Sequence, residues 1–267
     1  VISIIVAVHN QVEHSKLFLW SLRNYTYHPY ELIVVDNNST DGSGDFFEAE
    51  GSRVLRNDKN LCYACSQNQG MNLAKYQYFA FLNNDIYLSP NWDRDLLDAI
   101  SMYDLWAVSP SGIETMETRK AVRVVSRRWR WIGRHLHKRS DEKGLRRLIR
   151  LMYGDWESFC RRRREKFYPG VIDGIMGSCI LARRSLFDKI GNWDPGVEAS
   201  DWDFYLRVRT REESIGDVVR PKVVLWSYVH HFLRATADRK PSIECEHERI
   251  SLEERWGKEE IERLWYY

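Results

Sequence analysis

The first part of the chain alternates short apolar runs with longer segments in which apolar side chains recur at helical spacing. Residues 3–8 and 31–36 are near-continuous apolar runs that each end in polar residues, which is typical of strands covered on both faces. Residues 12–23 place apolar side chains three or four positions apart and predict a helix. The alternation continues to residue 82 and predicts a single α/β sandwich with a mainly parallel central sheet.

Pattern and charge divide the chain into four parts. Residues 1–110 hold the alternation of strands and helices, and residues 111–168 form a less regular insert that is rich in Arg and Trp. The α/β pattern returns in residues 169–240. A run rich in Glu, Arg and Trp predicts a closing helix within residues 241–267.

The net charge of +2 conceals a strong asymmetry. Residues 119–166 contain 18 Lys or Arg against five acidic residues, whereas the rest of the chain has 22 basic and 33 acidic residues. A helical reading of this insert gives Trp129, Ile132 and Leu136 one apolar stripe, suited to a lipid interface. The insert is therefore either a contact for an anionic partner or a helical lid held to the acidic body by salt bridges.

Polar residues stand at the ends of three predicted strands. His9-Asn10 follows the first, Asp36-Asn37-Asn38 the second, and Asn83-Asn84-Asp85 the strand predicted at residues 78–82. Ligands of parallel α/β sheets bind beyond the carboxyl ends of the strands. No glycine-rich dinucleotide or P-loop motif follows any of these strands, so a phosphate-bearing ligand must be bound in another way.

Six fragments follow one another along the chain: SIIVAVHN, ELIVVDNNSTDGS, NLCYACSQNQGMNLA, FLNNDIYLSPNW, GSCILARRSLFDKIGNWDP and SDWDFYLRVR. In their order and approximate spacing they resemble the family 2 glycosyltransferases, which are inverting, nucleotide-sugar-dependent enzymes of the GT-A fold. The resemblance covers residues 1–110 and 170–232, most of the chain outside the insert. It implies a GT-A fold with a basic helical insert.

The resemblance implies a divalent cation, Mn²⁺ or Mg²⁺, that neutralises the leaving diphosphate. Asp85 stands where the family has the last carboxylate of its DxD motif. Asn83 and Asn84 depart from Asp, which weakens the negative charge of the site without abolishing it. A histidine after the last strand often adds a metal contact in this family. His230 and His231 both stand there, and only one can face the cleft, since neighbouring strand residues alternate. We favour His230.

The donor is expected to lie along the first strand ends. Asp36 resembles the aspartate that accepts a hydrogen bond from a nucleobase N–H, and its alternative role is a simple turn or helix cap. The other residues that the resemblance assigns to the nucleotide sugar are Ala7, His9, Asn10, Asn60, Asn68 and Asn84.

A general base must remove the proton of the acceptor hydroxyl, and Asp201 matches the family's base in the segment SDWDF. Asp203 does not share its helix face, so only one of the two is expected to point into the cleft. Trp193 and Asp194, in the loop before this helix, are expected to bind the acceptor, with Trp193 stacked on a sugar ring. A single base driving direct displacement implies inversion of the anomeric configuration.

The resemblance implies a hexosyl- or deoxyhexosyl-transferase for cell-surface glycan or polysaccharide assembly, with a glycan acceptor that is free or lipid-linked. The alternative is a module that binds nucleic acid or another anionic polymer through the insert. The strand-end carboxylates argue against nucleic acid. The odd number of scattered cysteines and the lack of a visible signal peptide or membrane span favour the cytoplasm, with the insert on the inner face of a membrane.

Overall fold

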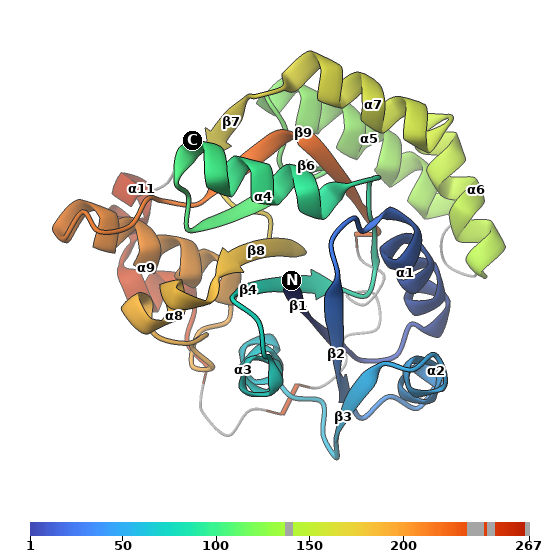
Figure 1. Ribbon diagram of the computed structural model, residues 1–267, viewed down its shortest axis with the longest axis horizontal. Coiled ribbons are helices and arrows are strands. Elements are labelled where there is room, and N and C mark those ends of the chain that lie inside the picture. Colours follow the sequence, from blue (N-terminus) through green and yellow to red (C-terminus); the bar gives the residue numbers. More distant parts are fainter. Residues whose placement is uncertain (137–140, 234–242, 245–248, 265–267) are drawn as a thin grey trace.

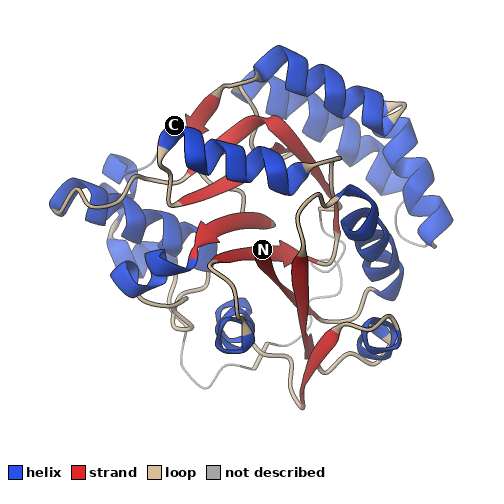
Figure 2. Ribbon diagram, viewed as in Figure 1, coloured by secondary structure: helices blue, strands red, loops and turns tan. Residues whose placement is uncertain are grey.

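A central twisted sheet runs through the molecule and carries helices on both faces (Figures 1 and 2). The structure, a computed structural model, describes residues 1–136, 141–233, 243–244 and 249–264. Within these residues the strand order is β3-β2-β1-β4-β8-β6-β9-β5, and β7 pairs with β9. The strands are β1 (Ile2–Val8), β2 (Tyr30–Asn37), β3 (Arg53–Asn57), β4 (Tyr78–Asn83), β5 (Ile86–Tyr87), β6 (Ala107–Gly112), β7 (Val171–Asp173), β8 (Cys179–Arg183) and β9 (Lys222–His231).

The first four strands are parallel, as the sequence predicts, and their register aligns their carboxyl ends. Val8 of β1 is paired with Asp36 of β2, and Ala7 of β1 with Asn83 of β4. The polar residues that follow these strands therefore lie at one edge of the sheet.

The second half of the sheet departs from the simple parallel pattern. Strand β8 lies antiparallel between β4 and β6, whereas β6 and β9 are parallel to each other. The pairing of Ile86 in β5 with His231 in β9 brings the residues after β4 next to the end of β9. The sequence gives little sign of β6, because its segment AVSPSG contains Pro and Gly, which count against a strand.

Two apolar cores sandwich the sheet. On one face α1, α2 and α4 pack against it through side chains such as Phe18, Phe47 and Trp92. On the other face α3, α8, α9 and α11 do so, with Phe187 and Phe204 at the centre. The helices are α1 (Val12–Tyr25), α2 (Ser43–Ala49), α3 (Tyr63–Leu73), α4 (Trp92–Tyr103), α8 (Arg184–Ile190), α9 (Ser200–Ser214), α10 (Leu252–Trp256) and α11 (Lys258–Leu264).

The basic insert is helical, as predicted, and forms a third core. It consists of α5 (Arg119–Leu136), α6 (Glu142–Tyr153) and α7 (Trp156–Phe167). Trp129 and Trp156 from the insert pack with Tyr228 and Phe232 at the end of β9. No helix in the described part of the chain is both long and apolar enough to cross a bilayer.

The C-terminal region differs from the single helix predicted within residues 241–267. Its described part contains two short helices, α10 and α11. Gly257 separates them with a φ of 74°, a positive value that glycine adopts without strain, and α10 ends there. The rest of the predicted helix, residues 241–242, 245–248 and 265–267, lies outside the described residues.

Candidate active site

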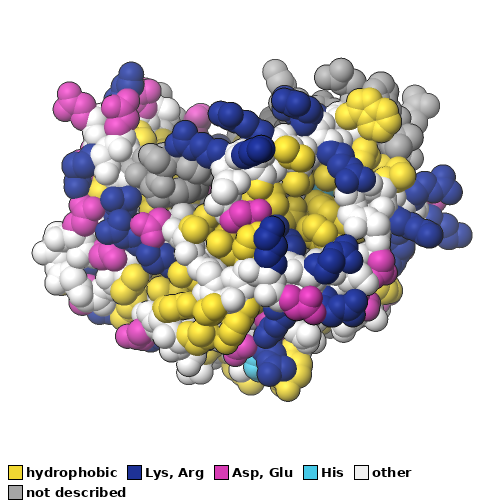
Figure 3. All heavy atoms as spheres, turned by 90° about the horizontal axis from the view of Figure 1, so that it is seen from above, with side chains coloured by type: hydrophobic (Ala, Val, Ile, Leu, Met, Phe, Trp, Pro, Cys, Tyr) yellow, Lys and Arg dark blue, Asp and Glu magenta, His cyan; other side chains and the backbone are white. Residues whose placement is uncertain are grey.

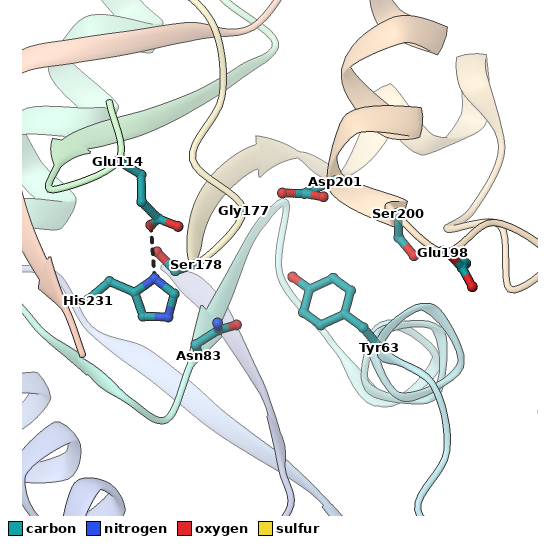
Figure 4. Close-up of a pocket in the computed structure, with 9 residues that line it drawn as sticks. All are labelled: Tyr63, Asn83, Glu114, Gly177, Ser178, Glu198, Ser200, Asp201 and His231. Carbon is teal, nitrogen blue, oxygen red and sulfur yellow. Dashed lines mark hydrogen bonds and ion pairs between the residues drawn. The ribbon is translucent and has the colours of Figure 1, made fainter. Parts of the chain in front are cut away.

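A cavity of about 230 Å³ lies at the carboxyl ends of the central strands (Figure 4). Its walls come from segments far apart in the chain: the start of α3, the end of β4, the turn after β6, the loop before β8, the start of α9 and the end of β9. This is the edge at which α/β sheets bind their ligands. The lining residues are Tyr63, Asn83, Glu114, Gly177, Ser178, Glu198, Ser200, Asp201 and His231.

One wall of the cavity carries an imidazole between two carboxylates. His231 Nε2 is 3.3 Å from Asp85 Oδ1, and His231 Nδ1 is 2.9 Å from Glu114 Oε2. Burial alone would lower the pKa of His231, but the two carboxylates outweigh it and raise the pKa to about 10. Burial likewise would raise the pKa of Asp85, yet the charge of His231 holds it below its ordinary value. Both groups are therefore charged at neutral pH.

The structure reverses our choice between the two histidines. His230 is fully buried on the opposite face of β9, beneath the insert. Its Nδ1 is 2.8 Å from the Tyr153 hydroxyl, and its ring packs edge-on against Trp129 at 4.7 Å. Because side chains alternate along a strand, His231 is the one that faces the cavity. His231 therefore replaces His230 as the candidate metal ligand.

Asp201, the second residue of α9, forms part of the wall opposite His231 (Figure 4). Its carboxylate lies so close to Gly177 that a Cβ on this glycine would be 2.1 Å from Asp201 Oδ2. Burial raises the pKa of Asp201 above its ordinary value. A carboxylate with a raised pKa holds a transferred proton more readily, which suits a general base.

Asp203 points away from the cavity, in line with the expectation that one aspartate of the pair faces the cleft. It is fully buried and accepts hydrogen bonds from Arg207 Nε at 2.7 Å and from Trp256 Nε1 at 3.0 Å. Asp203 thus joins α9 to α10.

The loops after β1 and β2 are bonded to each other. His9 Nδ1 is 2.7 Å from the carbonyl oxygen of Asn37. Asn10 donates its backbone N–H to Ser39 Oγ at 2.8 Å, and its side-chain oxygen accepts from Thr40 N at 2.8 Å. His9 and Asn10 are thereby fixed beside the end of β2.

Asp36 is buried at the end of β2, within the same group of loops. Its Oδ1 accepts a hydrogen bond from Ser39 N at 3.1 Å, and its Oδ2 is 3.7 Å from Arg56 Nη1. Asn84 is also buried, and its amide donates to Asn10 O at 3.2 Å and Ser15 Oγ at 3.0 Å. The structure thus brings Ala7, His9, Asn10, Asp36 and Asn84 to one edge, with Asn84 supporting the loop after β1.

Asn68 and Trp193 meet each other instead of the cavity. The Asn68 amide bonds both backbone groups of Trp193, accepting from its N at 3.1 Å and donating to its O at 2.9 Å. The Trp193 ring is 1% exposed and stacks on Phe204 in the core. A sugar cannot reach a ring in this position, so the predicted stacking role does not fit the structure.

Asp194 and Asn60 lie on loops at the rim of this region. Asp194 accepts a hydrogen bond from Gly196 N at 2.9 Å, and its other oxygen is 3.6 Å from Arg255 Nη2. The carbonyl oxygen of Asn60 accepts from Glu244 N at 2.8 Å. Neither residue belongs to the cavity lining.

Comparison with known proteins identifies the chain. The family model described as Glycosyl transferase family 2 matches residues 3–191, well over half of the sequence. The chain belongs to glycosyltransferase family 2. The resemblance read from the six fragments is thereby confirmed.

Curated relatives match about a third of this chain or slightly more. It is 33% identical over 89 residues to the Escherichia coli UDP-Glc:alpha-D-GlcNAc-diphosphoundecaprenol beta-1,3-glucosyltransferase WfaP, covering 32% of this chain and 36% of the relative. It is 27% identical over 108 residues to the glycosyltransferase GlyG of Streptococcus pneumoniae serotype 4, covering 39% and 36%. The match thus spans about a third of the length of each relative.

Solved structures confirm the GT-A fold of the glycosyltransferase. The mannosyltransferase PcManGT from Pyrobaculum calidifontis, in complex with GDP-Man and Mn²⁺, has a TM-score of 0.56 at 15% identity, over 88% of this chain and 57% of that one. S. aureus TarS 1-349 in complex with UDP has a TM-score of 0.52 at 13% identity, over 86% and 60%. At these identities the likeness concerns the fold alone.

The residues around Asp85 suit a divalent cation. Within the described residues, Asp85 Oδ1 is buried and accepts no hydrogen bond, and its charged neighbour is His231. One carboxylate and one imidazole are a small ligand set, and no cluster of three or more His, Cys, Asp or Glu suited to a metal occurs in the described part of the chain. Mg²⁺ and Mn²⁺ are commonly bound by few protein ligands together with substrate phosphates, so the two residues fit this role.

Several cavity residues had no signal in the sequence. Glu114, Tyr63 and Glu198 follow or begin elements whose place beside the cavity depends on pairing between distant strands and helices. Tyr63 lies next to Cys62 in the fragment NLCYACSQNQGMNLA, so the resemblance reached its segment without marking it. Glu114 follows β6, whose strand pattern is too weak to predict from the sequence, so the sequence gives no reason to place this residue at the site.

A methyl group at Gly177 is expected to displace the Asp201 carboxylate. In the variant Gly177→Ala the new Cβ would stand 2.1 Å from Asp201 Oδ2, so one of the two must move. We expect kcat to fall by about 100-fold, the effect of misplacing a catalytic group by about 1 Å. Steady-state kinetics and thermal unfolding would test this. The control Gly133→Ala, where the nearest atom is 3.6 Å away, should keep the kcat of the parent enzyme, and an unaltered kcat in Gly177→Ala would refute the placement of Asp201.

Proposed function

We propose that this glycosyltransferase transfers a sugar, with inversion, from a nucleotide-diphosphate donor to an acceptor hydroxyl. The proposal is supported by one arrangement: His231 and Asp201 line opposite sides of one cavity at the strand ends (Figure 4), and Asp85 is paired with His231. A diphosphate beside Asp85 would leave the anomeric carbon in the cavity between the two walls. Membership of glycosyltransferase family 2 supports the same reaction class.

The donor nucleotide is assigned to the loops after β1 and β2. Asp36 would accept a hydrogen bond from a nucleobase N–H, with Ala7, His9 and Asn10 beside the base. The mutual hydrogen bonds of these loops hold their shape before the donor arrives. The amides of Asn68 and Asn84 support the neighbouring backbone, and Asn60 stands at the rim.

Asp85 and His231 would hold Mn²⁺ or Mg²⁺. When bound, the cation supplies Lewis-acid stabilisation of the negative charge that forms on the leaving diphosphate. To bind it, His231 must lose its proton, since imidazole coordinates through a neutral ring nitrogen. Glu114, which faces the other ring nitrogen, would then orient the imidazole.

Asp201 would act as the general base. Its carboxylate takes the proton of the acceptor hydroxyl while the acceptor oxygen bonds to the anomeric carbon. The bond from that carbon to the diphosphate breaks at the same time, and the diphosphate leaves with the electron pair. Attack from the face opposite the leaving group inverts the anomeric configuration.

The acceptor is assigned to the side of the cavity formed by Glu198 and Ser200, with Asp194 on the loop that precedes them. We propose a glycan of cell-surface polysaccharide assembly, carried on a lipid diphosphate, and a cytoplasmic enzyme at the inner face of a membrane. The name of the relative WfaP, which acts on a diphosphoundecaprenol-linked sugar, supports this substrate class. The alternative, a nucleic-acid-binding module, has no support from the relatives.

A donor screen tests the proposed reaction. EDTA-treated protein is mixed with UDP-, GDP- and dTDP-sugars, with and without Mn²⁺, and its thermal unfolding is followed. We expect one nucleotide class to raise the unfolding temperature only with Mn²⁺, because a ligand that binds the folded state stabilises it. NMR of the product formed from that donor should show the opposite anomeric configuration. A retained configuration contradicts inversion, and the absence of any metal-dependent shift contradicts the donor assignment.

A further inference from the structure

The face of α5 that the sequence assigns to a lipid interface is buried inside the protein. Trp129 and Ile132 are each 3% exposed and pack in the core that α5 shares with the end of β9. The side chain of Leu136 lies outside the described residues. The predicted stripe therefore binds the body of the protein, which leaves the other side of the helix exposed.

The outer side of α5 carries two exposed apolar side chains. Val124 is 61% exposed and Trp131 is 67% exposed. They are seven residues apart, which is about two helical turns, so they lie on the same side of the helix. The exposed Arg127 and Arg128 lie between them in sequence, three and four residues after Val124.

Helix α6 extends this surface. Arg128 Nη2 donates a hydrogen bond to the carbonyl oxygen of Leu151, at 2.6 Å, and Leu151 is 44% exposed. Figure 3 shows the molecule from above, turned by 90° from the view of Figure 1. Many Lys and Arg side chains lie over the half that holds α6 and α7. We call the following exposed residues of α5 and α6 the Arg–Trp face: Arg123, Val124, Arg127, Arg128, Arg130, Trp131, Arg147, Arg150 and Leu151.

Two of the four arginines of α7 are paired with carboxylates outside that helix. Arg163 of α7 is 3.1 Å from Glu117, and Arg164 is paired with Asp95 of α4. No carboxylate of the described residues forms an ion pair with an arginine of the Arg–Trp face, and α5 itself contains no acidic residue. Salt bridges thus hold one side of α7 to the body through Arg163 and Arg164, whereas the arginines of the Arg–Trp face keep their positive charge for an external partner.

We propose that the Arg–Trp face binds the surface of an anionic lipid bilayer. Arginines attract acidic headgroups, and an exposed Trp sits well at the boundary between headgroups and acyl chains. Val124 and Leu151 favour a bilayer over nucleic acid, because aliphatic side chains are stabilised in the acyl region and find no such partner along a phosphate backbone. Helix α5, with 18 residues, would lie along the surface over about 27 Å.

This contact would hold the cavity close to the membrane. The inner side of α5 places Trp129 against His230, the neighbour of the cavity residue His231. The strand that carries one wall of the cavity is thereby packed directly on the helix that faces the lipid. The binding itself does not depend on the proposed reaction, so the two can fail separately.

Vesicle sedimentation with the whole chain tests the Arg–Trp face. We expect the protein to bind vesicles of phosphatidylcholine with about 30% phosphatidylglycerol, to bind less as salt rises, and to leave pure phosphatidylcholine vesicles unbound. The variant Arg123→Gln/Arg127→Gln/Arg130→Gln should bind about 100-fold more weakly, and Trp131→Ala about 10-fold more weakly.

A matched control removes the same charge from α7. The variant Arg161→Gln/Arg162→Gln/Lys166→Gln neutralises three exposed cations outside the Arg–Trp face and should keep most of the vesicle binding. All variants are first checked for an unaltered unfolding temperature. The proposal is overturned if anionic vesicles are not bound, if the control loses as much affinity as the α5 variant, or if a duplex or single-stranded oligonucleotide binds more tightly than the vesicles.

Discussion

Replacement of Asp201 by Asn is expected to lower kcat by about 1,000-fold. Asparagine keeps the size of the side chain but cannot accept the proton of the acceptor hydroxyl, and loss of a general base typically costs 10²- to 10⁴-fold. Because the change is nearly isosteric, donor affinity should stay close to that of the parent enzyme. Steady-state kinetics and donor titration would separate the two effects.

The pH profile of the parent enzyme offers a second readout of Asp201. The base must be deprotonated to act, and burial raises the pKa of Asp201. The acidic limb of kcat/KM should therefore lie at higher pH than an exposed aspartate would give, and activity should fall as the pH drops through that limb.

Asp203→Asn serves as the control for Asp201→Asn. Asp203 bonds Arg207 and Trp256, away from the cavity, so its substitution should lower stability by up to about 3 kcal/mol while kcat is largely kept. Equal losses of kcat in the two variants would remove Asp201 from its proposed role.

Replacement of Asp85 by Asn is expected to weaken Mn²⁺ binding by at least about 100-fold. The variant loses the carboxylate charge next to His231. Even the substitution of a residue that only contacts a metal ligand commonly lowers metal affinity by 10- to 100-fold. Electron paramagnetic resonance of free Mn²⁺ would measure this without any substrate. Asp104→Asn, which alters an exposed carboxylate paired with Arg183, should bind Mn²⁺ as the parent does.

The same variant should change the titration of His231 in metal-free protein. Asp85 and Glu114 raise the pKa of His231 to about 10, so removal of Asp85 should lower it, as NMR of the ring would show. The raised pKa of His231 stabilises the folded state fully at a pH below about 6.5, the pKa of histidine in the unfolded chain. This stabilisation is lost as the pH rises through about 10. Undiminished Mn²⁺ binding in Asp85→Asn, or an unchanged His231 titration, would contradict the assigned site.

The parallel half of the fold could be predicted because its signals are local. Each of β1, β2 and β4 is a buried apolar run, and a polar residue marks where each one ends. Parallel pairing then brings Asp36 and Asn83 to one edge without further information. The break at Gly257 also had a local signal, since glycine commonly ends a helix.

The features that could not be predicted depend on contacts between distant segments. Alternation along β9 showed that only one of His230 and His231 faces the cavity, but the choice follows from Trp129 and Tyr153 of the insert, which pack against His230. The prediction that the apolar stripe of α5 suits a lipid interface is wrong for Trp129 and Ile132, because both pack in the protein core. Glu114 reaches His231 across a separation of 117 residues, and no pattern along the chain indicates such a pair.

The two hydrogen bonds between the Asn68 amide and the backbone of Trp193 limit how the walls of the cavity can move. They tie α3, which begins with Tyr63, to the loop that leads into α9 and Asp201. We therefore expect α3 and this loop to move together when substrates enter or leave the cavity.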